Sequence, residues 1–293
     1  MKEFSLNVSR IALGTVQFGQ DYGIANNRGK ILEKESYEIL NYAKDVGVNC
    51  LDTACTYGDS ESIIGEFLLK NKDSFNVVSK LSVDGDEDLE EIIGNSLKKL
   101  NMDSLYGYLL HRFEDFVEKE WLWNAFEGLK AKGLVSKIGF SLYNTKDLDF
   151  ILSKNINFDL IQVPYSIFDR RFERYFNILK QKNVEIHVRS VFLQGLFFLD
   201  PNSLKGHLPK AKDHLNKIRD ISQKNDISIS ALCLNYALLD EYIDKVVIGI
   251  DGLDHLRENI KNLNLFDKVC EIKEEIDKLS IEDEDILLPN KWS

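Results

Sequence analysis

The chain has 293 residues, of which 44% are hydrophobic, and a formal net charge of −11. This length fits one large globular domain or two small ones. The acidic balance argues against a nucleic-acid partner, because nucleic-acid interfaces cluster Lys and Arg along one face. No apolar run approaches the roughly 18 residues of a membrane span, and the amino terminus lacks a signal-peptide core. We therefore expect a cytoplasmic protein with no membrane partner.

Four cysteines, Cys50, Cys55, Cys233 and Cys270, are scattered along the chain. They form no CxxC pair, and no histidine cluster has the spacing of metal ligands. We expect reduced thiols and neither a disulfide framework nor a metal site.

Short β-branched or apolar runs alternate with longer segments of helical spacing, which is typical of βα units around a parallel sheet. The expected strands are Ile11–Thr15, Val48–Asp52, Asn76–Lys80, Leu105–His111, Lys137–Ser141, Leu160–Pro164, Glu185–Arg189 and Lys245–Gly249. The expected helices are Glu33–Val46, Glu61–Lys70, Leu89–Leu100, Trp121–Lys132, Thr145–Lys154, Phe172–Lys182, Lys210–Lys224 and Ser230–Leu239.

Eight such units predict an α/β protein with the (β/α)₈ architecture of a TIM barrel, as a single domain over residues 1–293. An open doubly wound sheet is the alternative, and the absence of a GxGxxG motif after the first strand disfavours it. Residues from about 265 to 293 form a tail, with a charged helical stretch at Lys268–Leu279 and an extended segment at Leu287–Ser293. The tail either covers the open mouth of the barrel or packs on its side.

Nearly every expected helix closes with a residue type that tolerates a left-handed backbone. These residues are Gly47, Asn71, Asn101, Gly133, Asn155, Asn183 and Asn225. The acidic stretch Asp84–Glu91 is interpreted as a solvated helix start, where carboxylates favour the positive end of the helix dipole.

Polar side chains stand at the expected carboxyl end of strand after strand. They are Asp52, Lys80, His111, Ser141, Gln162 and Arg189. Because the carboxyl ends of parallel barrel strands converge, we expect these side chains to face one pocket.

Four of the candidate residues suit carbonyl chemistry together. An ammonium at Lys80 would lower the pKa of the Tyr57 phenol, and a carboxylate at Asp52 would keep that lysine protonated. His111 could then orient a substrate oxygen toward the phenol. No nucleophile with a base, metal cage or phosphate cradle accompanies them, so we expect proton transfer coupled to hydride delivery by a cofactor. Taken singly, His111 could equally be a core histidine and Lys80 a structural ion-pair partner.

The segment Gly47–Glu61, GVNCLDTACTYGDSE, resembles the signature of the aldo-keto reductase family, which places its catalytic Asp and Tyr five residues apart. The resemblance extends from Ile11 to about Leu263. Further matching motifs are Leu13-Gly14-Thr15 with Gly19, Val77–Leu81, Leu109–Arg112, Ile138–Ser141, Gln162 in LIQVPY, Arg189–Gly195 and Val247–Asn259.

This resemblance implies an NAD(P)H-dependent reductase of aldehydes or ketones, with a small carbonyl substrate. The short segment between His111 and Trp121 indicates an open polar pocket, which would suit sugar-like or other hydroxylated carbonyls. Tyr57 would be the general acid, supported by Lys80, Asp52 and His111. The implied cofactor contacts are Gly14, Thr15, Ser141, Gln162, Arg189, Ser190, Gly249, Asp251, His255 and Asn259. NADPH is the expected cofactor because the family as a whole prefers it, and NADH is the alternative.

Two departures from the family pattern concern the nicotinamide end. The frequent Ser-Asn pair reads Ser141-Leu142 here, which removes one hydrogen bond to the carboxamide unless Asn144 supplies it. Where many members place an aromatic ring against the nicotinamide, this chain offers Arg189, whose planar guanidinium can also stack.

A third departure concerns the adenosine end. The lysine and arginine that often hold a 2′-phosphate correspond here to Gly249 and His255. Asp251 lies close by, and a carboxylate near a ribose favours a free 2′-hydroxyl. Arg257 is the residue that could compensate.

Two other functions stay open at this point. One is a non-catalytic barrel that binds the cofactor as a sensor or regulatory subunit. The other is an isomerase or lyase that uses Lys80 or His111 as its base. The sequence makes no prediction of the oligomeric state.

Overall fold

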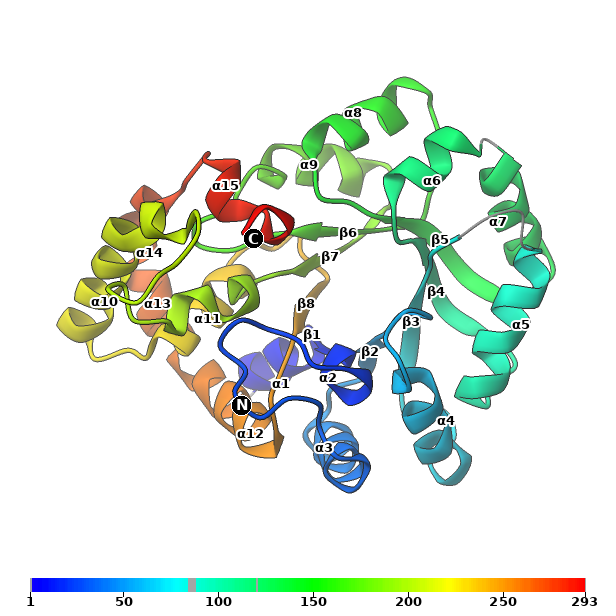
Figure 1. Ribbon diagram of the computed structural model, residues 1–293, viewed down its shortest axis with the longest axis horizontal. Helices are drawn as coiled ribbons and strands as arrows, with labels where there is room; N and C mark the ends of the chain where they lie inside the picture. Colours follow the sequence, from blue (N-terminus) through cyan, green and yellow to red (C-terminus); the bar gives the residue numbers. More distant parts are fainter. Residues whose placement is uncertain (1, 84–87, 120, 293) are drawn as a thin grey trace.

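A computed structural model of the chain describes residues 2–83, 88–119 and 121–292. Eight parallel strands, β1 to β8, follow one another around a closed barrel, and β8 pairs with β1. Figure 1 shows these strands at the centre of the molecule with the helices around them. The predicted (β/α)₈ barrel is therefore confirmed, and the closure between β8 and β1 rules out the open sheet.

The strands lie within two residues of the predicted bounds. They are β1 Ile11–Gly14, β2 Cys50–Asp52, β3 Asn76–Leu81, β4 Leu105–Leu110, β5 Val135–Ser141, β6 Leu160–Pro164, β7 Glu185–Arg189 and β8 Lys245–Ile248. The helices between and around them are α1 Lys2–Ser9, α2 Val16–Gly19, α3 Glu33–Val46, α4 Ser60–Lys70, α5 Leu89–Leu100, α6 Phe113–Glu118, α7 Trp121–Ala131, α8 Thr145–Ser153, α9 Glu173–Gln181, α10 Lys212–Asn225, α11 Ile229–Leu238 and α12 Leu253–Asn262.

Side chains inside the barrel follow the two-residue repeat of a β-strand, so that alternate residues face the same side. A small apolar cluster, separate from the main core, fills the lower interior of the barrel. Its buried members are Ala12, Cys50, Val78, Leu109, Leu160 and Val247. Two residues further along the same strands stand Gly14, Asp52, Lys80, His111, Gln162 and Gly249. The strand repeat thus brings the predicted site residues to one layer, directly above an apolar floor.

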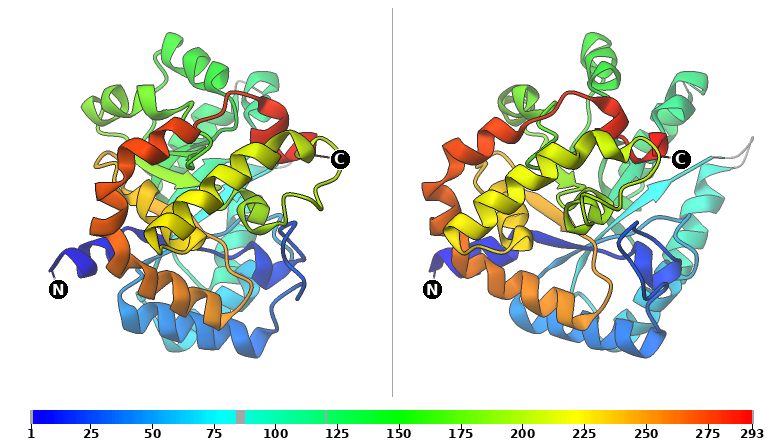
Figure 2. Two further views of the ribbon diagram at one scale, coloured as in Figure 1. Left: turned by 90° about the vertical axis from the view of Figure 1, so that its left-hand side faces the viewer. Right: turned by 60° about the vertical axis from the view of Figure 1, so that its left-hand side comes forward.

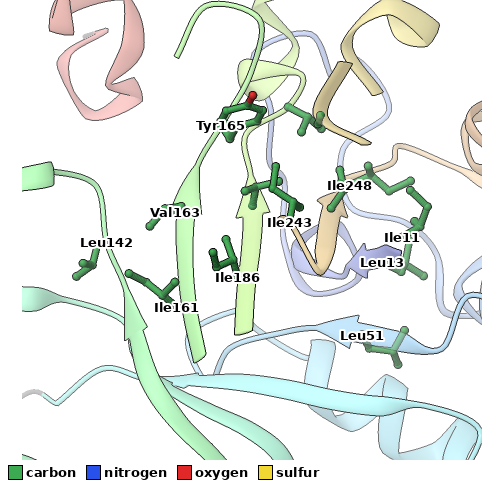
Figure 3. Packing of buried hydrophobic residues seen from close by; sticks show 14 of the residues in the cluster. Ile11, Leu13, Leu51, Leu142, Ile161, Val163, Tyr165, Ile186, Ile243 and Ile248 are labelled. Atoms are coloured by element: carbon green, nitrogen blue, oxygen red, sulfur yellow. The ribbon is translucent and has the colours of Figure 1, made fainter. Parts of the chain in front are cut away.

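The main hydrophobic core lies between the barrel wall and the surrounding helices. The opposite strand faces contribute to it, with Leu13 on β1, Leu51 on β2, Ile161 on β6 and Ile186 on β7 among its fully buried members. Figure 3 shows these side chains beside their strands. Because this wall is rigid and closely packed, it fixes the positions from which the site residues project.

Five of the predicted helix-closing residues do adopt the left-handed conformation. They are Gly47, Asn101, Gly133, Asn155 and Asn183. The prediction is wrong at Asn71, whose φ is −135°, and at Asn225, which is the last residue of α10. After α10 the left-handed residue is Asp226, with a φ of 51°. At the start of α5, Asp88 accepts a hydrogen bond from the backbone of Glu90, while residues 84–87 of the predicted acidic start lie outside the described residues.

The tail packs on the side of the barrel. It contains α13 Phe266–Glu271, α14 Lys273–Ile276 and α15 Glu284–Leu287, with the short 3₁₀ turns Asp277–Leu279 and Pro289–Lys291. Figure 2 shows this segment running beside α10. The backbone amide of Ile281 donates to the carbonyl of Phe168, and Asp277 accepts from Arg170. The expected extended segment after Leu287 is wrong, because a 3₁₀ turn follows there.

Candidate active site

One cavity of about 420 Å³ opens at the carboxyl ends of the strands. Every predicted site residue except Lys80 lines it. These lining residues are Gly14, Thr15, Asp52, Tyr57, His111, Ser141, Gln162, Arg189, Ser190, Gly249, Asp251, His255 and Asn259. Lys80 lies directly beneath them, with its side chain 1% exposed. The structure therefore brings together all of the residues that the sequence placed in one pocket.

Lys80 connects the carboxylate of Asp52 to the phenol of Tyr57. Its Nζ lies 2.7 Å from Asp52 Oδ2 and donates to the Thr53 carbonyl at 2.9 Å. The same Nζ lies 3.5 Å from the Tyr57 hydroxyl. The other Asp52 oxygen accepts from Gln162 Nε2 at 2.6 Å, so both oxygens of the buried carboxylate are satisfied. A charged pair in such a site is retained when its members are both paired and hydrogen-bonded, as here.

The loop that carries Tyr57 is held by close backbone contact with α2. A Cβ on Gly19 would come within 1.6 Å of the Tyr57 carbonyl oxygen, and one on Gly58 would come within 2.4 Å of the Gly19 carbonyl oxygen. Only glycine permits this approach, and Gly58 also has a φ of +52°. The Ser60 hydroxyl, at the start of α4, donates to the Thr15 carbonyl at 2.9 Å. These contacts fix the direction in which the phenol points.

Burial raises the pKa of Tyr57 and outweighs the lowering by Lys80, so the pKa lies above its ordinary value. The expectation of a phenol with a lowered pKa is therefore wrong, although Lys80 does act to lower the Tyr57 pKa, because burial has the larger effect. Burial acts to lower the pKa of Lys80, but the contacts with Asp52 and Tyr57 raise it by more than burial lowers it. The pKa therefore lies above its ordinary value, and the lysine is charged. The site therefore pairs a neutral phenol with an ammonium at neutral pH.

His111 stands beside the phenol as a neutral imidazole. Its ring meets that of Tyr57 edge-on, with the ring centroids 6.0 Å apart. Burial, together with the nearby charges of Lys80 and Arg189, lowers the pKa of His111 to about 3. One ring nitrogen is consequently a donor and the other an acceptor across the physiological pH range.

Next to the phenol, Ser141 and Gln162 present adjacent polar groups from β5 and β6. The Ser141 hydroxyl donates to Gln162 Oε1 at 3.4 Å. Asn144 immediately precedes α8 and is not among the residues that line the cavity, so it does not replace the amide missing at Leu142. The carboxamide of a nicotinamide would here be held by Ser141 and Gln162.

Arg189 lies at the end of β7 with its guanidinium against the ring of Tyr143, 3.8 Å from the ring centroid. It donates to the Leu142 carbonyl at 3.0 Å and to the Ser190 hydroxyl at 3.2 Å. The planar group is therefore already stacked on one aromatic ring of the chain itself. Among the cavity-lining residues, all of them described, Arg189 is the only arginine or lysine.

The far end of the cavity is formed by the loop after β8 and the first turns of α12. Gln17 Nε2 donates to Asp251 Oδ1 at 3.5 Å, and the Asp251 backbone amide donates to His255 Nδ1 at 3.4 Å. Asn259 lines the same end and is 6% exposed. Gln17 Oε1 is buried and has no hydrogen-bond partner in the described part of the chain. This end of the cavity is thus a polar subsite in which the Gln17 side-chain oxygen is free to accept a hydrogen bond from a ligand.

Sequence reasoning missed several lining residues. They are Gln17, Tyr22, Tyr143 and Ser230, whereas Gln194, Gly195 and Glu258 lie in matched motifs without having been named singly. Tyr22 and Tyr143 lie in irregular segments, where no periodicity indicates a side chain's direction, and Gln17 lies in the four-residue helix α2. Phe192 and Phe198, which follow β7, do line the cavity, whereas the neighbouring Phe197 is buried against Phe168.

The two loops that carry Tyr22 and Gln194 meet over the cavity. The backbone amide of Ile24 donates to the Gln194 carbonyl at 3.0 Å, and Gln194 Nε2 donates to the Tyr22 hydroxyl at 2.9 Å. Gln194 holds a left-handed φ of 51° in this contact. The loops after β1 and β7 are therefore joined across the mouth of the barrel.

The residues present fit a nicotinamide dinucleotide. The cavity runs continuously from Tyr57 to Asn259, and hydroxyl, amide and carboxylate groups line it at both ends. The unpartnered Gln17 oxygen provides an acceptor that a bound ligand could satisfy. Within the described residues, no three His, Cys, Asp or Glu side chains form a group that could hold a metal ion. No helix of the described ranges is long and apolar enough to cross a membrane.

Comparison with known proteins agrees with this geometry. The uncharacterized oxidoreductase YqkF of Bacillus subtilis is 26% identical over 284 residues, with 88% of each chain covered. An aryl-alcohol dehydrogenase of Pestalotiopsis microspora is 26% identical, covering 98% of this chain and 82% of its own. The holo form of aldo-keto reductase AKR11C1 from Bacillus halodurans superposes with a TM-score of 0.75 at 23% identity, covering 94% of both chains. The family model for the aldo/keto reductase family matches residues 10–281, and the chain belongs to that family.

Proposed function

We propose that this protein transfers a hydride reversibly between a nicotinamide dinucleotide and the carbonyl carbon of an aldehyde or ketone. The observation that carries the proposal is the buried connection from Asp52 through Lys80 to Tyr57, in a cavity that also reaches Asp251 and Asn259. The bound cofactor would supply the hydride. A small, hydroxylated, sugar-like carbonyl is the substrate class that we propose for this polar pocket.

In this proposal Tyr57 delivers the proton that neutralises the new alkoxide. Its raised pKa keeps the hydroxyl protonated, so the proton is available at neutral pH. Lys80 lies 3.5 Å from the same oxygen and stabilises the phenolate that remains once the proton has left. Asp52 holds Lys80 in the charged form, and neutral His111 donates a hydrogen bond that orients the substrate oxygen.

At the nicotinamide end, Ser141 and Gln162 would hold the carboxamide. Arg189 and Ser190 would line the same part of the pocket, with Gly14 and Thr15 at the end of β1. Gly249, Asp251, His255 and Asn259 would receive the adenosine end. These contacts orient the ligand and exclude water.

Replacement of the phenol tests the proposal. Tyr57→Phe should lower the turnover of aldehydes by roughly 10² to 10⁴, because general acid catalysis contributes about that factor. The dissociation constants of NADH and NADPH, measured by fluorescence titration, should stay unchanged. Tyr143→Phe is the matched control, since it removes another cavity hydroxyl but keeps the ring on Arg189, and it should reduce turnover only a few-fold.

The same assay separates the other functions. Binding of a dinucleotide without turnover of any of a panel of aldehydes would indicate a sensor or regulatory subunit. No binding of either dinucleotide would point to an isomerase or lyase on the same barrel. Full turnover by Tyr57→Phe would refute the role assigned to the phenol.

A further inference from the structure

The far end of the cavity presents acceptors rather than cations. Asp251, Glu258 and Gln17 all line it. Gln17 Nε2 points to Asp251 Oδ1, which leaves Gln17 Oε1 as the buried atom without a partner among the described residues. Gln17 is 5% exposed, so water gives this oxygen little compensation. Glu258 Oε1 accepts from the Ser230 hydroxyl at 3.3 Å, and the acceptor positions that stay open favour a ligand that donates hydrogen bonds.

The cations near this subsite are directed elsewhere. Arg28 makes a two-pronged pair with Glu35, at 3.1 and 2.8 Å, and donates to the Asp251 carbonyl at 2.9 Å. Arg257 pairs with Asp254 at 3.2 Å and lies over the ring of Tyr42. Neither arginine lines the cavity. The residue that could have compensated for the missing family cations, Arg257, therefore does not do so.

His255 contacts Asp251 through one ring nitrogen. Its Nδ1 lies 3.4 Å from the Asp251 backbone amide nitrogen and 3.7 Å from Asp251 Oδ2. At Gly249, a Cβ would come within 3.1 Å of Gln17 Nε2, so Gln17 fills the space into which a longer side chain would project.

We infer that the subsite of Gln17, Asp251 and Glu258 recognises a ribose with a free 2′-hydroxyl, and that the protein selects NAD(H) over NADP(H). This inference rests on the proposed function, which places a dinucleotide in the cavity. A ribose hydroxyl donates to a carboxylate or amide oxygen, whereas a 2′-phosphate offers acceptors and negative charge to a site that already has both. The family-based expectation of NADPH thus gives way to NADH on the charges of this chain.

The adenosine end can be tested without any reaction. Isothermal titration of the full chain with ADP-ribose and with 2′-phospho-ADP-ribose compares the two sugars in the absence of nicotinamide. We expect ADP-ribose to bind at least roughly tenfold more tightly, because the phosphate leaves acceptors unpaired and adds like-charge repulsion. NADH and NADPH should show the same ratio.

Two matched variants test whether Asp251 contacts the ribose and thereby sets the preference for a free 2′-hydroxyl. Asp251→Asn removes the charge and adds donors, so 2′-phospho-ADP-ribose should bind about tenfold more tightly and ADP-ribose a few-fold more weakly. Asp267→Asn removes the same charge from the neighbouring helix α13, where the residue is exposed and does not line the cavity. That control should leave the ratio of the two dissociation constants unchanged.

The outcomes separate this inference from the function beneath it. Equal or tighter binding of the phosphorylated ligands by the unmodified chain overturns the inference alone. Equal shifts from Asp251→Asn and Asp267→Asn overturn it too, because general charge rather than contact would then set the preference. If no dinucleotide or fragment binds, the proposed function fails together with the inference.

Discussion

At the scale of single residues, the site depends on which protonation state each group holds. Burial opposes charge on Tyr57 and His111, and both groups are neutral at pH 7 as a result. Lys80 keeps its charge because Asp52 lies 2.7 Å away. A neutral donor beside a fixed positive charge is the arrangement that an alkoxide-forming reduction requires.

These states predict the pH dependence of the reaction. Carbonyl reduction needs the proton on Tyr57, and that proton is lost only as the pH rises through a pKa above about 10. His111 becomes charged only near pH 3. We therefore expect kcat/KM for reduction to be flat between about pH 5 and pH 9, and alcohol oxidation to accelerate as the pH rises. Stopped-flow or steady-state rates across this range provide the measurement.

A lysine variant checks the cause of that profile. Lys80→Met removes the positive charge that lowers the pKa of Tyr57, so the alkaline limit of reduction should move to higher pH while the rate falls. An alkaline limit between pH 6 and pH 8 in the unmodified protein would contradict the protonation states described above.

The sequence predicted the residues at strand ends better than those in loops. Asp52, Lys80 and Gln162 follow apolar runs, and the two-residue repeat fixes the side to which each side chain points. Gln17 and Tyr22 lie in a segment whose path depends on contacts with distant residues, such as the Gln194 carbonyl that accepts from Ile24. Such contacts leave no local pattern in the sequence, and the inferred cofactor preference depends on one of these two residues, Gln17.

At the scale of elements, long helices were predicted closely because their apolar spacing repeats over several turns. Helices α3 and α5 begin and end at the predicted residues. The short helices α1, α2 and α6 were missed, since four to eight residues are too few to display a period. The left-handed residue after α10 was also misplaced by one position, because Asn225 and Asp226 are both residue types that tolerate the left-handed backbone.

The end of α10 allows a direct test of that correction. Asp226 holds a φ of 51°, where glycine is free of strain, so Asp226→Gly should raise the free energy of unfolding by about 0.5–1 kcal/mol. Asn225 is still helical and donates to the Ile221 carbonyl at 2.8 Å, so Asn225→Gly should lower it by about 1 kcal/mol. Denaturant unfolding of the two variants measures both effects. If Asn225→Gly were the more stable variant and Asp226→Gly the less stable one, the left-handed residue that closes α10 would be Asn225, as the sequence predicted.

At the scale of the whole molecule, the proposed catalytic residues and a stabilising polar network lie at opposite ends of the barrel. The cavity lies at the carboxyl ends of the strands, and a second polar network lies inside the barrel toward the other end. Glu185 on β7 accepts from the Tyr106 hydroxyl at 2.7 Å, contacts His187 Nε2 at 2.6 Å and also pairs with Lys137. This network joins β4 and β5 to β7 across the interior, as a structural role at the amino-terminal face would require.

Glu185 should therefore contribute to stability and not to turnover. Burial acts to raise the pKa of Glu185, but the contacts with His187, Lys137 and Tyr106 lower it by more than burial raises it. The pKa of this carboxyl therefore lies well below its usual range. Glu185→Gln should lower the free energy of unfolding at pH 7 by about 2 kcal/mol, less than for a fully buried pair because the side chain is 12% exposed. Glu282→Gln, at an exposed carboxylate, should change it by less than about 0.5 kcal/mol.

The pH dependence of that difference gives the sharper result. A carboxylate whose folded pKa is depressed stabilises the protein above its unfolded pKa of about 4.3, and this stabilisation is lost as the pH falls toward the folded value. The gap in unfolding free energy between the unmodified chain and Glu185→Gln should thus be constant from pH 6 to pH 8 and narrow below about pH 4. Turnover per folded molecule should match that of the unmodified chain, because the network is separated from Tyr57 by the apolar floor of the barrel. A gap that widened in acid, or a loss of turnover without loss of stability, would place Glu185 in the chemistry instead.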